Sequence, residues 1–338
     1  MSSERNLTEI AANSRFSISY SDVASASGRI SRHAIRTPII VNDELDRLLS
    51  ARVLLKAETL QVTGSFKFRG ALNRVSRMTA DERKGGIVAW SSGNHALAIS
   101  AVAARHGIKA TILMPSDAPR AKIEGAQRFG GIVRLYDRAT EVRETIGAEI
   151  AAATGAIIIP PYDDPDIMAG QGTVALEIAE QARERGVELD MLAVSCSGGG
   201  LAAGCAVAVQ GASPQTRVYC VEPEGFDDTA RSLASGRREG NKAEAKSLCD
   251  ALQVAMPGEL TFPVNQALLA GALVVTDAEV KQAMRVAYDL LKLVVEPGGV
   301  APLAAALAGK LDVAGNAVAL VLSGGNVDHD KFAACIAG

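Results

Sequence analysis

Lys67 is the residue of this sequence whose surroundings best suit covalent chemistry. It lies between Phe66 and Phe68, at the predicted start of a helix. An apolar pocket and a helix N-terminus both disfavour the charged ammonium group, so they leave the amine available as a base or as a Schiff-base nucleophile. The surrounding residues do not match the GxxxxGK[ST] nucleotide-binding loop. A lysine of this kind can carry an aldehyde cofactor, although a solvated lysine at a helix start is the commoner arrangement.

A glycine-rich loop gives the strongest signal for a bound anion. It follows the apolar run 191–195 and consists of Ser197, Gly198, Gly199, Gly200 and Leu201. Where such a loop joins a strand to a helix, several backbone N–H groups and the helix dipole can face one anion. Consecutive glycines also cost conformational entropy, which tight packing alone rarely justifies. We therefore expect this loop to bind a phosphate group.

The same stretch permits a second interpretation. Gly198, Gly200 and Gly204 are followed by a predicted strand and then Glu222, close to the glycines and ribose-binding acid of dinucleotide-binding units. The third glycine stands one residue late, and the unit lies in the middle of the chain. The glycines alone therefore leave open whether the phosphate belongs to a nicotinamide cofactor or to another one.

A third segment suits a carboxylate. It lies between the predicted strand 86–90 and a predicted helix, and it consists of Ser91, Ser92, Gly93, Asn94 and His95. Hydroxyl and N–H groups at the start of a helix bind a carboxylate well. Capping of the helix by Ser92 or Asn94 is compatible with that role.

The composition argues against several classes of function. There are 35 Lys and Arg residues against 38 Asp and Glu, and the net charge of −3 is too near neutral to favour a nucleic acid or an anionic membrane as partner. No apolar run approaches the roughly 20 residues of a membrane span, and residues 1–21 lack the apolar core of a secretory signal, so we expect a cytoplasmic protein. The five cysteines form no CxxC pair and the four histidines share no HxxxH or HExxH spacing, which argues against zinc.

The elements that must position these residues follow from the hydrophobic pattern. Short runs rich in Val and Ile alternate with longer Ala-rich segments of helical period, which is typical of an α/β fold with parallel sheets. Strands are expected at residues 53–56, 86–90, 110–114, 131–135, 156–159, 191–195, 217–221 and 318–322. Helices are expected at residues 66–76, 95–106, 119–129, 139–153, 171–185, 200–210 and 277–291. The charged segment 232–247 is expected to be a solvated surface excursion without a chemical role.

Four of these segments occur together along residues 20–327. They read SFKFRG at 65–70, SSGNH at 91–95, SGGGL at 197–201 and SGGN at 323–326. The combination resembles the pyridoxal-phosphate enzymes of the tryptophan synthase β fold type (fold type II), and within them the threonine/serine dehydratase and serine racemase group. The resemblance implies two open twisted sheets flanked by helices. It also implies a large domain (residues 1–80 and 157–338), a small domain (residues 81–156) and pyridoxal 5'-phosphate in the cleft between them.

The resemblance implies a role for each residue around the cofactor. Lys67 would form the Schiff base with pyridoxal phosphate and later move the α-proton of the substrate. Phe66 would pack beside the cofactor ring, and Asn94 would hydrogen-bond to its phenolic oxygen. The loop 197–201 would bind the phosphate, although Ser197 stands where the commoner form of the loop has glycine. Ser323 would face the pyridine nitrogen, where a hydroxyl does not enforce ring protonation and so suits elimination.

The resemblance also implies how a substrate is held. Ser91, Ser92, Gly93, Asn94 and His95 match the loop that binds the α-carboxylate. Ser92 matches the hydroxyl that faces the lysine across the substrate in serine racemases, so its presence permits racemisation with two bases. Arg143 stands where serine racemases place a substrate-facing arginine, and a guanidinium can bind a second carboxylate bidentately, which would favour 3-hydroxyaspartate over threonine. An ion pair with a neighbouring glutamate is the alternative for Arg143.

A divalent cation site is implied next to the strand that ends near residue 221. Glu222, the backbone carbonyl of Phe226, and Asp228 match the ligands of this site in the group. Oxygen ligands suit Mg²⁺ or Ca²⁺, with water molecules completing the shell. A solvated acidic turn is the alternative for these residues.

Taken together, the motifs predict a dehydratase, or ammonia-lyase, that depends on pyridoxal phosphate. It would eliminate water from a 3-hydroxy amino acid of the threonine/serine, 3-hydroxyaspartate or phenylserine type and give a 2-keto acid and ammonia. A serine or aspartate racemase, with Ser92 returning the proton, is the alternative, and an NAD-dependent oxidoreductase is a more distant one. The expected partner is a small amino acid substrate, and a homodimer is the family expectation.

Overall fold

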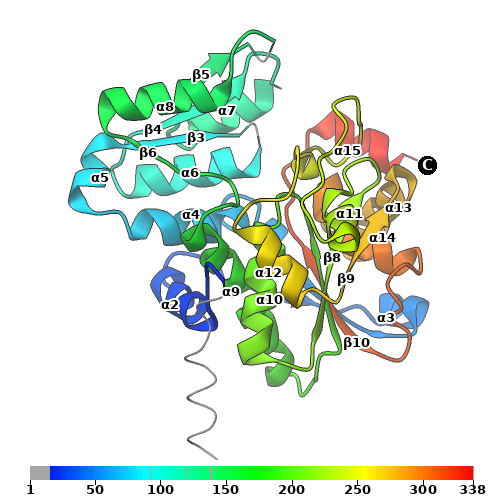
Figure 1. Ribbon diagram of the computed structural model, residues 1–338. Helices are drawn as coiled ribbons and strands as arrows, with labels where there is room; N and C mark the ends of the chain where they lie inside the picture. Colours follow the sequence, from blue (N-terminus) through cyan, green and yellow to red (C-terminus); the bar gives the residue numbers. More distant parts are fainter. Residues whose placement is uncertain (1–15, 92, 119, 138, 338) are drawn as a thin grey trace, which may run out of the picture.

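The computed structural model describes residues 16–91, 93–118, 120–137 and 139–337. Ser92, which the resemblance matches to the hydroxyl that faces the lysine in serine racemases, lies outside the described residues. Within them the chain forms one sheet of six strands and one of four strands, which lie in separate parts of the molecule (Figure 1). The expected α/β class with two sheets flanked by helices is confirmed.

The six-stranded sheet has the order β1-β2-β10-β7-β8-β9. Its strands are β1 (Ile39–Ile40), β2 (Arg52–Ala57), β7 (Met191–Ser195), β8 (Arg217–Pro223), β9 (Gly271–Val275) and β10 (Ala317–Leu322). All neighbours pair in parallel except β1, which runs antiparallel to β2. The carboxyl ends of β7 and β10 therefore meet at one edge, where ligands bind in open sheets of this kind.

Side chains that alternate along these strands build two separate hydrophobic layers, as the period of two requires. One layer packs under the helices α2 (Tyr20–Ile30), α9 (Pro165–Glu184), α10 (Gly200–Ala212) and α12 (Thr261–Leu268). The other packs under α3 (Asp43–Leu49), α13 (Asp277–Asp289), α14 (Ala301–Leu307) and α15 (His329–Ile336). The sheet is thus buried on both faces, in keeping with its continuous apolar strands.

The four-stranded sheet has the order β5-β4-β3-β6 and is parallel throughout. Its strands are β3 (Ile87–Trp90), β4 (Ala110–Pro115), β5 (Ile132–Tyr136) and β6 (Ile157–Ile158). The helices around it are α4 (Lys67–Ser76), α5 (Ala80–Gly85), α6 (Asn94–Arg105), α7 (Arg120–Arg128) and α8 (Arg143–Thr154). Side chains of α4, α6 and α7 share one hydrophobic cluster with this sheet, and α8 covers the other face.

Several boundaries differ from the sequence prediction for local reasons. α9 begins at Pro165 rather than at residue 171, because the Asp164 side chain accepts a hydrogen bond from the Ile167 N–H (2.9 Å) and Pro165 occupies the first turn. α8 begins at Arg143 rather than at residue 139, because the preceding Val142 is extended. The elements that the prediction lacks are α2, α3, α5, α12, α14, α15, β1 and β9, given above, and the short α11 (Asp228–Ser235), η1 (Glu58–Leu60), η2 (Asp250–Leu252) and η3 (Pro297–Gly299).

A buried cluster of charges fixes the start of α4, which carries Lys67. The Arg69 guanidinium is fully buried and donates to both oxygens of the Glu58 carboxylate, at 2.8 and 2.7 Å. It also donates to both oxygens of Glu177 on α9, and Lys56 of β2 donates to Glu177 at 2.6 Å. These contacts join α4 to β2, η1 and α9 and hold the backbone two residues beyond Lys67.

The described helices include none that is long and apolar enough to cross a bilayer. All five cysteines are buried free thiols.

Candidate active site

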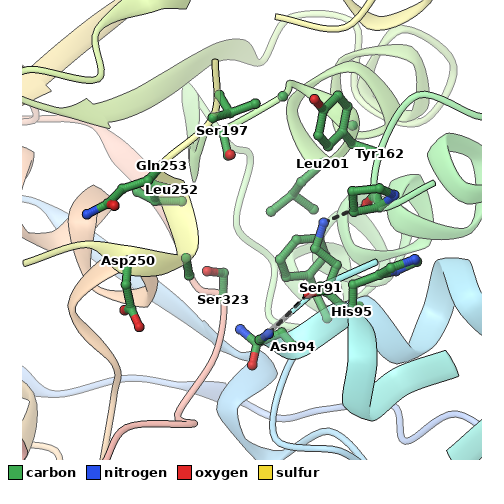
Figure 2. A pocket seen from close by; sticks show the side chains of 18 of the residues that line it. Ser91, Asn94, His95, Tyr162, Ser197, Leu201, Asp250, Leu252, Gln253 and Ser323 are labelled. Atoms are coloured by element: carbon green, nitrogen blue, oxygen red, sulfur yellow. Dashed lines mark hydrogen bonds between the residues drawn. The ribbon is translucent and has the colours of Figure 1, made fainter. Parts of the chain in front are cut away.

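A cavity of about 1020 Å³ lies between the two sheets and brings the predicted segments together. It is lined by residues from all four motifs, including Lys67, Asn94, Gly199 and Ser323. Figure 2 shows Ser197 and Tyr162 at one end of this cavity and Asn94 at the other, with Ser323 and Asp250 along its side. Motifs that are up to 258 residues apart (323 − 65) thus form one site.

The Lys67 amine lies in this cavity and has a single hydrogen-bond partner among the described residues. Its Nζ donates to the carbonyl oxygen of Pro161 at 2.7 Å and lies 5.1 Å from the centre of the Phe66 ring. Burial lowers the pKa of Lys67 to about 8, against the opposing influence of Glu296. A substantial fraction of the amine is therefore neutral near pH 8 and can act as a nucleophile or base.

The backbone around Lys67 is tied to the end of β10. The Phe66 N–H donates to the Ser323 carbonyl at 3.1 Å, and Ser65 forms a β-bridge with Gly324. The backbone next to Lys67 is consequently held beside the backbone of Ser323.

The glycine loop forms a cradle in which side chains have no room. A Cβ at Gly198 would lie 2.3 Å from the Tyr162 ring, and one at Gly199 would lie 2.5 Å from the Asn265 amide nitrogen. Gly199 also has φ +94°, which L side chains rarely adopt. The loop leads into α10, and among the described residues no acceptor takes the N–H groups of Gly199 and Gly200. These exposed donors at a helix start fit a phosphate group, as the sequence predicts.

The segment 91–95 leads from β3 into α6. The Ser91 hydroxyl oxygen accepts a hydrogen bond from the Gly93 N–H at 3.0 Å. His95 is buried and its Nε2 lies 3.0 Å from the carbonyl oxygen of Ile159, while burial and the nearby Lys67 lower its pKa to about 3. The imidazole is therefore neutral and engaged with the chain at Ile159.

The Asn94 side chain is held between Glu296, which lies outside the predicted motifs, and Asn326, to which the motifs assign no role. Its Nδ2 donates to the Glu296 carboxylate at 2.5 Å, and its Oδ1 accepts from the Asn326 amide at 2.7 Å. Asn326 also donates to the Thr63 carbonyl at 2.8 Å. This network fixes the orientation of the Asn94 amide. The sequence does contain a local signal for Glu296. This residue stands just before Gly298 and Gly299, and the other site residues also stand close to glycines.

Arg143 lies at the first turn of α8 and lines the cavity. Its Nε donates to Glu144 at 2.8 Å, and its side chain is 47% exposed. Both interpretations of the sequence are thus compatible with the structure: the guanidinium is paired with its neighbour and also faces the cavity.

A second cationic side chain, on a helix next to the four-stranded sheet, reaches across the cavity. Lys122 of α7 donates to the carboxylate of Asp250 in η2, which also contacts Lys331 of α15 at 3.1 Å. Lys122 and Asp250 both line the cavity. Neither was predicted, because nothing local in the sequence pairs residues 128 positions apart.

The charged segment 232–247, expected to be a solvated surface excursion, brings the Arg238 side chain to the wall of the cavity. This guanidinium lines the cavity and donates to the Pro257 carbonyl at 2.8 Å and to Glu259 at 3.1 Å. It thereby anchors the stretch 250–259, which forms one wall of the cavity.

Glu222 and Asp228 lie behind the glycine loop, at the end of β8 and the start of α11. Both Glu222 oxygens accept backbone N–H bonds, from Thr229 at 2.9 Å and Ala230 at 2.8 Å. The Asp228 Oδ1 accepts from the Asn241 amide at 2.5 Å, whereas its buried Oδ2 has no partner among the described residues. Burial raises the pKa of both carboxyl groups, to about 8 for Glu222 and about 6 for Asp228.

This geometry speaks against the dinucleotide interpretation. Glu222 is fully buried and is not among the residues that line the cavity. It cannot bind a ribose there. An unpartnered carboxylate oxygen beside a second carboxylate does fit a cation, although no cluster of three or more His, Cys, Asp or Glu side chains converges anywhere in the described residues.

The site agrees with what comparisons with other proteins find. Residues 30–324 match the model of a family described as pyridoxal-phosphate dependent enzyme. The chain is 42% identical over 320 residues to L-threo-3-hydroxyaspartate ammonia-lyase from Pseudomonas sp, covering 95% of this chain and 99% of that protein. It is 40% identical over 314 residues to a serine racemase from Schizosaccharomyces pombe, covering 93% of this chain and 96% of that protein.

Solved structures show the same relationship. The crystal structure of a threonine deaminase superposes with a TM-score of 0.87 at 40% identity, over 92% of this chain and 99% of that one. The structure of maize serine racemase gives a TM-score of 0.89 at 34% identity, over 94% of this chain and 96% of that one. With Lys67, the glycine cradle and Ser323 around one cavity, these matches show that the chain belongs to the pyridoxal-phosphate dependent enzyme family.

Proposed function

We propose that this chain is a 3-hydroxy amino acid dehydratase that acts on 3-hydroxyaspartate. The net reaction removes the α-proton and the β-hydroxyl as water, and hydrolysis of the resulting imine then consumes one water and releases a 2-keto acid and ammonia. The observation that carries the proposal is the position of the Lys67 amine, which shares one cavity with a phosphate cradle and a carboxylate-binding segment.

Bound pyridoxal phosphate supplies an electrophilic aldehyde and an electron-withdrawing ring, which together make the α-proton of an amino acid acidic. The glycine loop would bind its phosphate, the Asn94 amide would hydrogen-bond to its phenolic oxygen, and the Ser323 hydroxyl would face its pyridine nitrogen. Lys67 Nζ, with its lowered pKa, would hold the cofactor and would take the α-proton of the substrate. Ser323 carries no charge and would not enforce protonation of the ring nitrogen, which suits loss of the β-hydroxyl.

Two parts of the site would bind the substrate. Segment 91–95 holds the α-carboxylate with N–H groups and the Ser91 hydroxyl, and Ser92 is the residue proposed to face Lys67. Arg143 would bind the second carboxylate of 3-hydroxyaspartate by releasing Glu144, since a guanidinium binds a carboxylate bidentately. The 42% identity to an L-threo-3-hydroxyaspartate ammonia-lyase supports this choice, and the substrate comparison below tests it against threonine, since a threonine deaminase is 40% identical.

Glu222, the Phe226 carbonyl and Asp228 are proposed to bind Mg²⁺ or Ca²⁺. The unpartnered Oδ2 of Asp228 supports this, because a buried carboxylate oxygen without a donor is costly unless a cation neutralises it. The proposal predicts that either metal raises the melting temperature of the wild-type protein and not that of Asp228→Asn. Equal responses of the two proteins would contradict it.

The remaining proposals concern the whole chain. Residues 81–156 are proposed to close as a small domain over the large domain of residues 1–80 and 157–338, excluding water from the cavity. The contact of Lys122 with Asp250 across the cavity supports such closure. We also propose a homodimer in the cytoplasm, where five free thiols would stay reduced, and sedimentation of the purified protein tests the dimer.

A racemase is the second candidate, because the 40% identity to a serine racemase is nearly as high as that to the ammonia-lyase. Both activities use Lys67 at the α-carbon. They differ in the fate of the β-hydroxyl, which the racemase retains and the dehydratase expels.

The experiment that separates these functions offers the purified protein L-threo-3-hydroxyaspartate, L-threonine, L-serine and 3-phenylserine. Keto acid, ammonia and the enantiomer of the remaining amino acid are measured, with visible absorption as the readout of cofactor. The proposal expects keto acid and ammonia in equal amounts, fastest from 3-hydroxyaspartate, and loss of both the visible band and activity in Lys67→Ala. Inverted amino acid without keto acid would establish the racemase, and a Lys67→Ala protein as active as wild type would exclude both.

A further inference from the structure

The carbonyl side of the glycine loop is held by a helix that no motif of the sequence singled out. The Thr261 hydroxyl donates to the Gly198 carbonyl at 2.6 Å, and the Asn265 Nδ2 donates to the Gly199 carbonyl at 3.3 Å. Both side chains are fully buried on α12. The Gly258 N–H adds a third bond, to the Gly198 carbonyl at 3.1 Å.

Asp163 holds α12 in place from a distant part of the chain. Its carboxylate accepts from the N–H groups of Glu259 at 2.9 Å, Leu260 at 2.9 Å and Thr261 at 3.2 Å. These are the N–H groups at the start of α12, which lack a partner in any helix, and the residue in the cap position, Leu260, has no side-chain acceptor. A carboxylate from 96 to 98 positions earlier therefore supplies the missing cap.

The direction of these bonds decides which way the loop presents its donors. The described chain has no cis peptide bond, and in a trans peptide unit the C=O and the following N–H point in opposite directions. A Gly198 carbonyl turned toward Thr261 therefore turns the Gly199 N–H away from α12, and a Gly199 carbonyl turned toward Asn265 does the same for Gly200. The side away from α12 is the cavity, which both glycines line.

We infer that Asp163, Thr261 and Asn265 form a clamp that sets the orientation of two peptide units and so aims the Gly199 and Gly200 N–H groups at an anion in the cavity. They are positioning residues, because Thr261 and Asn265 bond to the loop carbonyls and Asp163 bonds to the start of α12. The clamp rests on the proposed function in one respect, which is that the anion is the phosphate of the cofactor. Without the clamp, glycine peptides rotate freely and the loop loses its preorganised donors.

The clamp predicts a loss of affinity that is specific to the phosphate. Full-length protein freed of cofactor is titrated with pyridoxal 5'-phosphate and, separately, with pyridoxal, which has the same aldehyde and no phosphate. Thr261→Val and Asn265→Leu keep the shape of each side chain and remove its donor. Each is expected to weaken binding of the phosphate ester by about 10-fold or more, the scale of a lost buried hydrogen bond, with pyridoxal binding unchanged. Asp163→Asn should act in the same direction, since an amide oxygen cannot accept all three N–H groups.

Two further variants separate positioning from folding. Thr261→Ser restores the hydroxyl and is expected to recover phosphate-specific affinity. Thr216→Val is the matched control, because the buried Thr216 hydroxyl also donates to a carbonyl, that of Leu189 at 2.8 Å, away from the cavity. It should leave the affinity ratio of the two ligands unchanged.

The outcomes distinguish failure of the clamp from failure of the proposed function. If wild-type protein binds both ligands equally, the cavity has no phosphate site and the proposed function fails. If wild type prefers the phosphate ester and folded Thr261→Val and Asn265→Leu prefer it to the same degree, the clamp is wrong while the function stands. Equal weakening of both ligands would also overturn the clamp, because it would show a general change of the site.

Discussion

The Asn94 amide donates a 2.5 Å hydrogen bond to the buried carboxylate of Glu296, which lies 202 residues later in the chain. Asn326 donates to the oxygen of the same amide, so the two orientations of Asn94 are not equivalent. Only the observed one satisfies both neighbours. Glu296 is thus expected to act on the proposed chemistry through Asn94, which lines the cavity.

Replacing Glu296 tests this relationship. Glu296→Gln keeps an acceptor for Asn94 and is expected to stay within a few-fold of wild-type kcat. Glu296→Leu leaves the Asn94 donor unpaired and should lower kcat by about 10- to 100-fold, the scale of a lost hydrogen bond to a charged group. Steady-state kinetics with saturating cofactor checks both. Equal activity of Glu296→Leu and wild type would contradict the role.

Glu296 also makes stability depend on pH. Burial raises its pKa to about 7 from an ordinary value of 4.5, so the folded state binds this proton more tightly than the unfolded state. The full contribution of this proton to the free energy of unfolding is present below about pH 4.5 and is lost as pH rises through 7. Relative to Glu296→Gln, the cofactor-free wild type should lose on the order of 3 kcal/mol between about pH 4.5 and pH 8. Urea unfolding of both proteins at several pH values measures this, and parallel curves would refute the assignment.

Arg143 should discriminate between substrates by their second carboxylate. Arg143→Gln is expected to raise the KM for 3-hydroxyaspartate by about 10- to 100-fold and to leave the KM for serine nearly unchanged, because serine has no group for the guanidinium to bind. Arg120→Gln is the matched control, since Arg120 also pairs with a glutamate on a helix of the four-stranded sheet and is 91% exposed outside the cavity. A parallel loss with both substrates would assign Arg143 a structural role.

Breaking the buried charge cluster should lower the free energy of unfolding far more than breaking a surface ion pair. Arg69→Met leaves the Glu58 carboxylate buried and uncompensated, which is expected to cost about 3–5 kcal/mol of unfolding free energy. Arg52→Met removes the partner of Asp46 at the surface and should cost about 0–1 kcal/mol. Denaturant unfolding measures both. The double variant Arg69→Met, Glu58→Gln should recover part of the loss, because the unpaired buried charge is then gone.

Local patterns in the sequence determined the fold class, most of the strands and the residues of the four motifs. Strands such as β7 and β10 are buried on both faces, so their apolar runs stand out, and the glycines of the cradle are visible because few other roles justify them. The edge strands β1 and β9 were not predicted, because β1 has only two residues and the side chains of β9 are largely half-buried. Family resemblance, carried by the motifs, supplied the cofactor and the reaction type.

Only the tertiary structure decided how the motifs are held. Glu296 meets Asn94, Asp163 caps α12, and Lys122 reaches Asp250 across separations of 202, 96 to 98 and 128 residues. Contacts of this kind depend on which strand ends share a sheet edge and on how two sheets face each other, and no local periodicity encodes either. The same is true of the raised or lowered pKa values of Lys67 and Glu296, because desolvation is a property of the assembled cavity rather than of a segment.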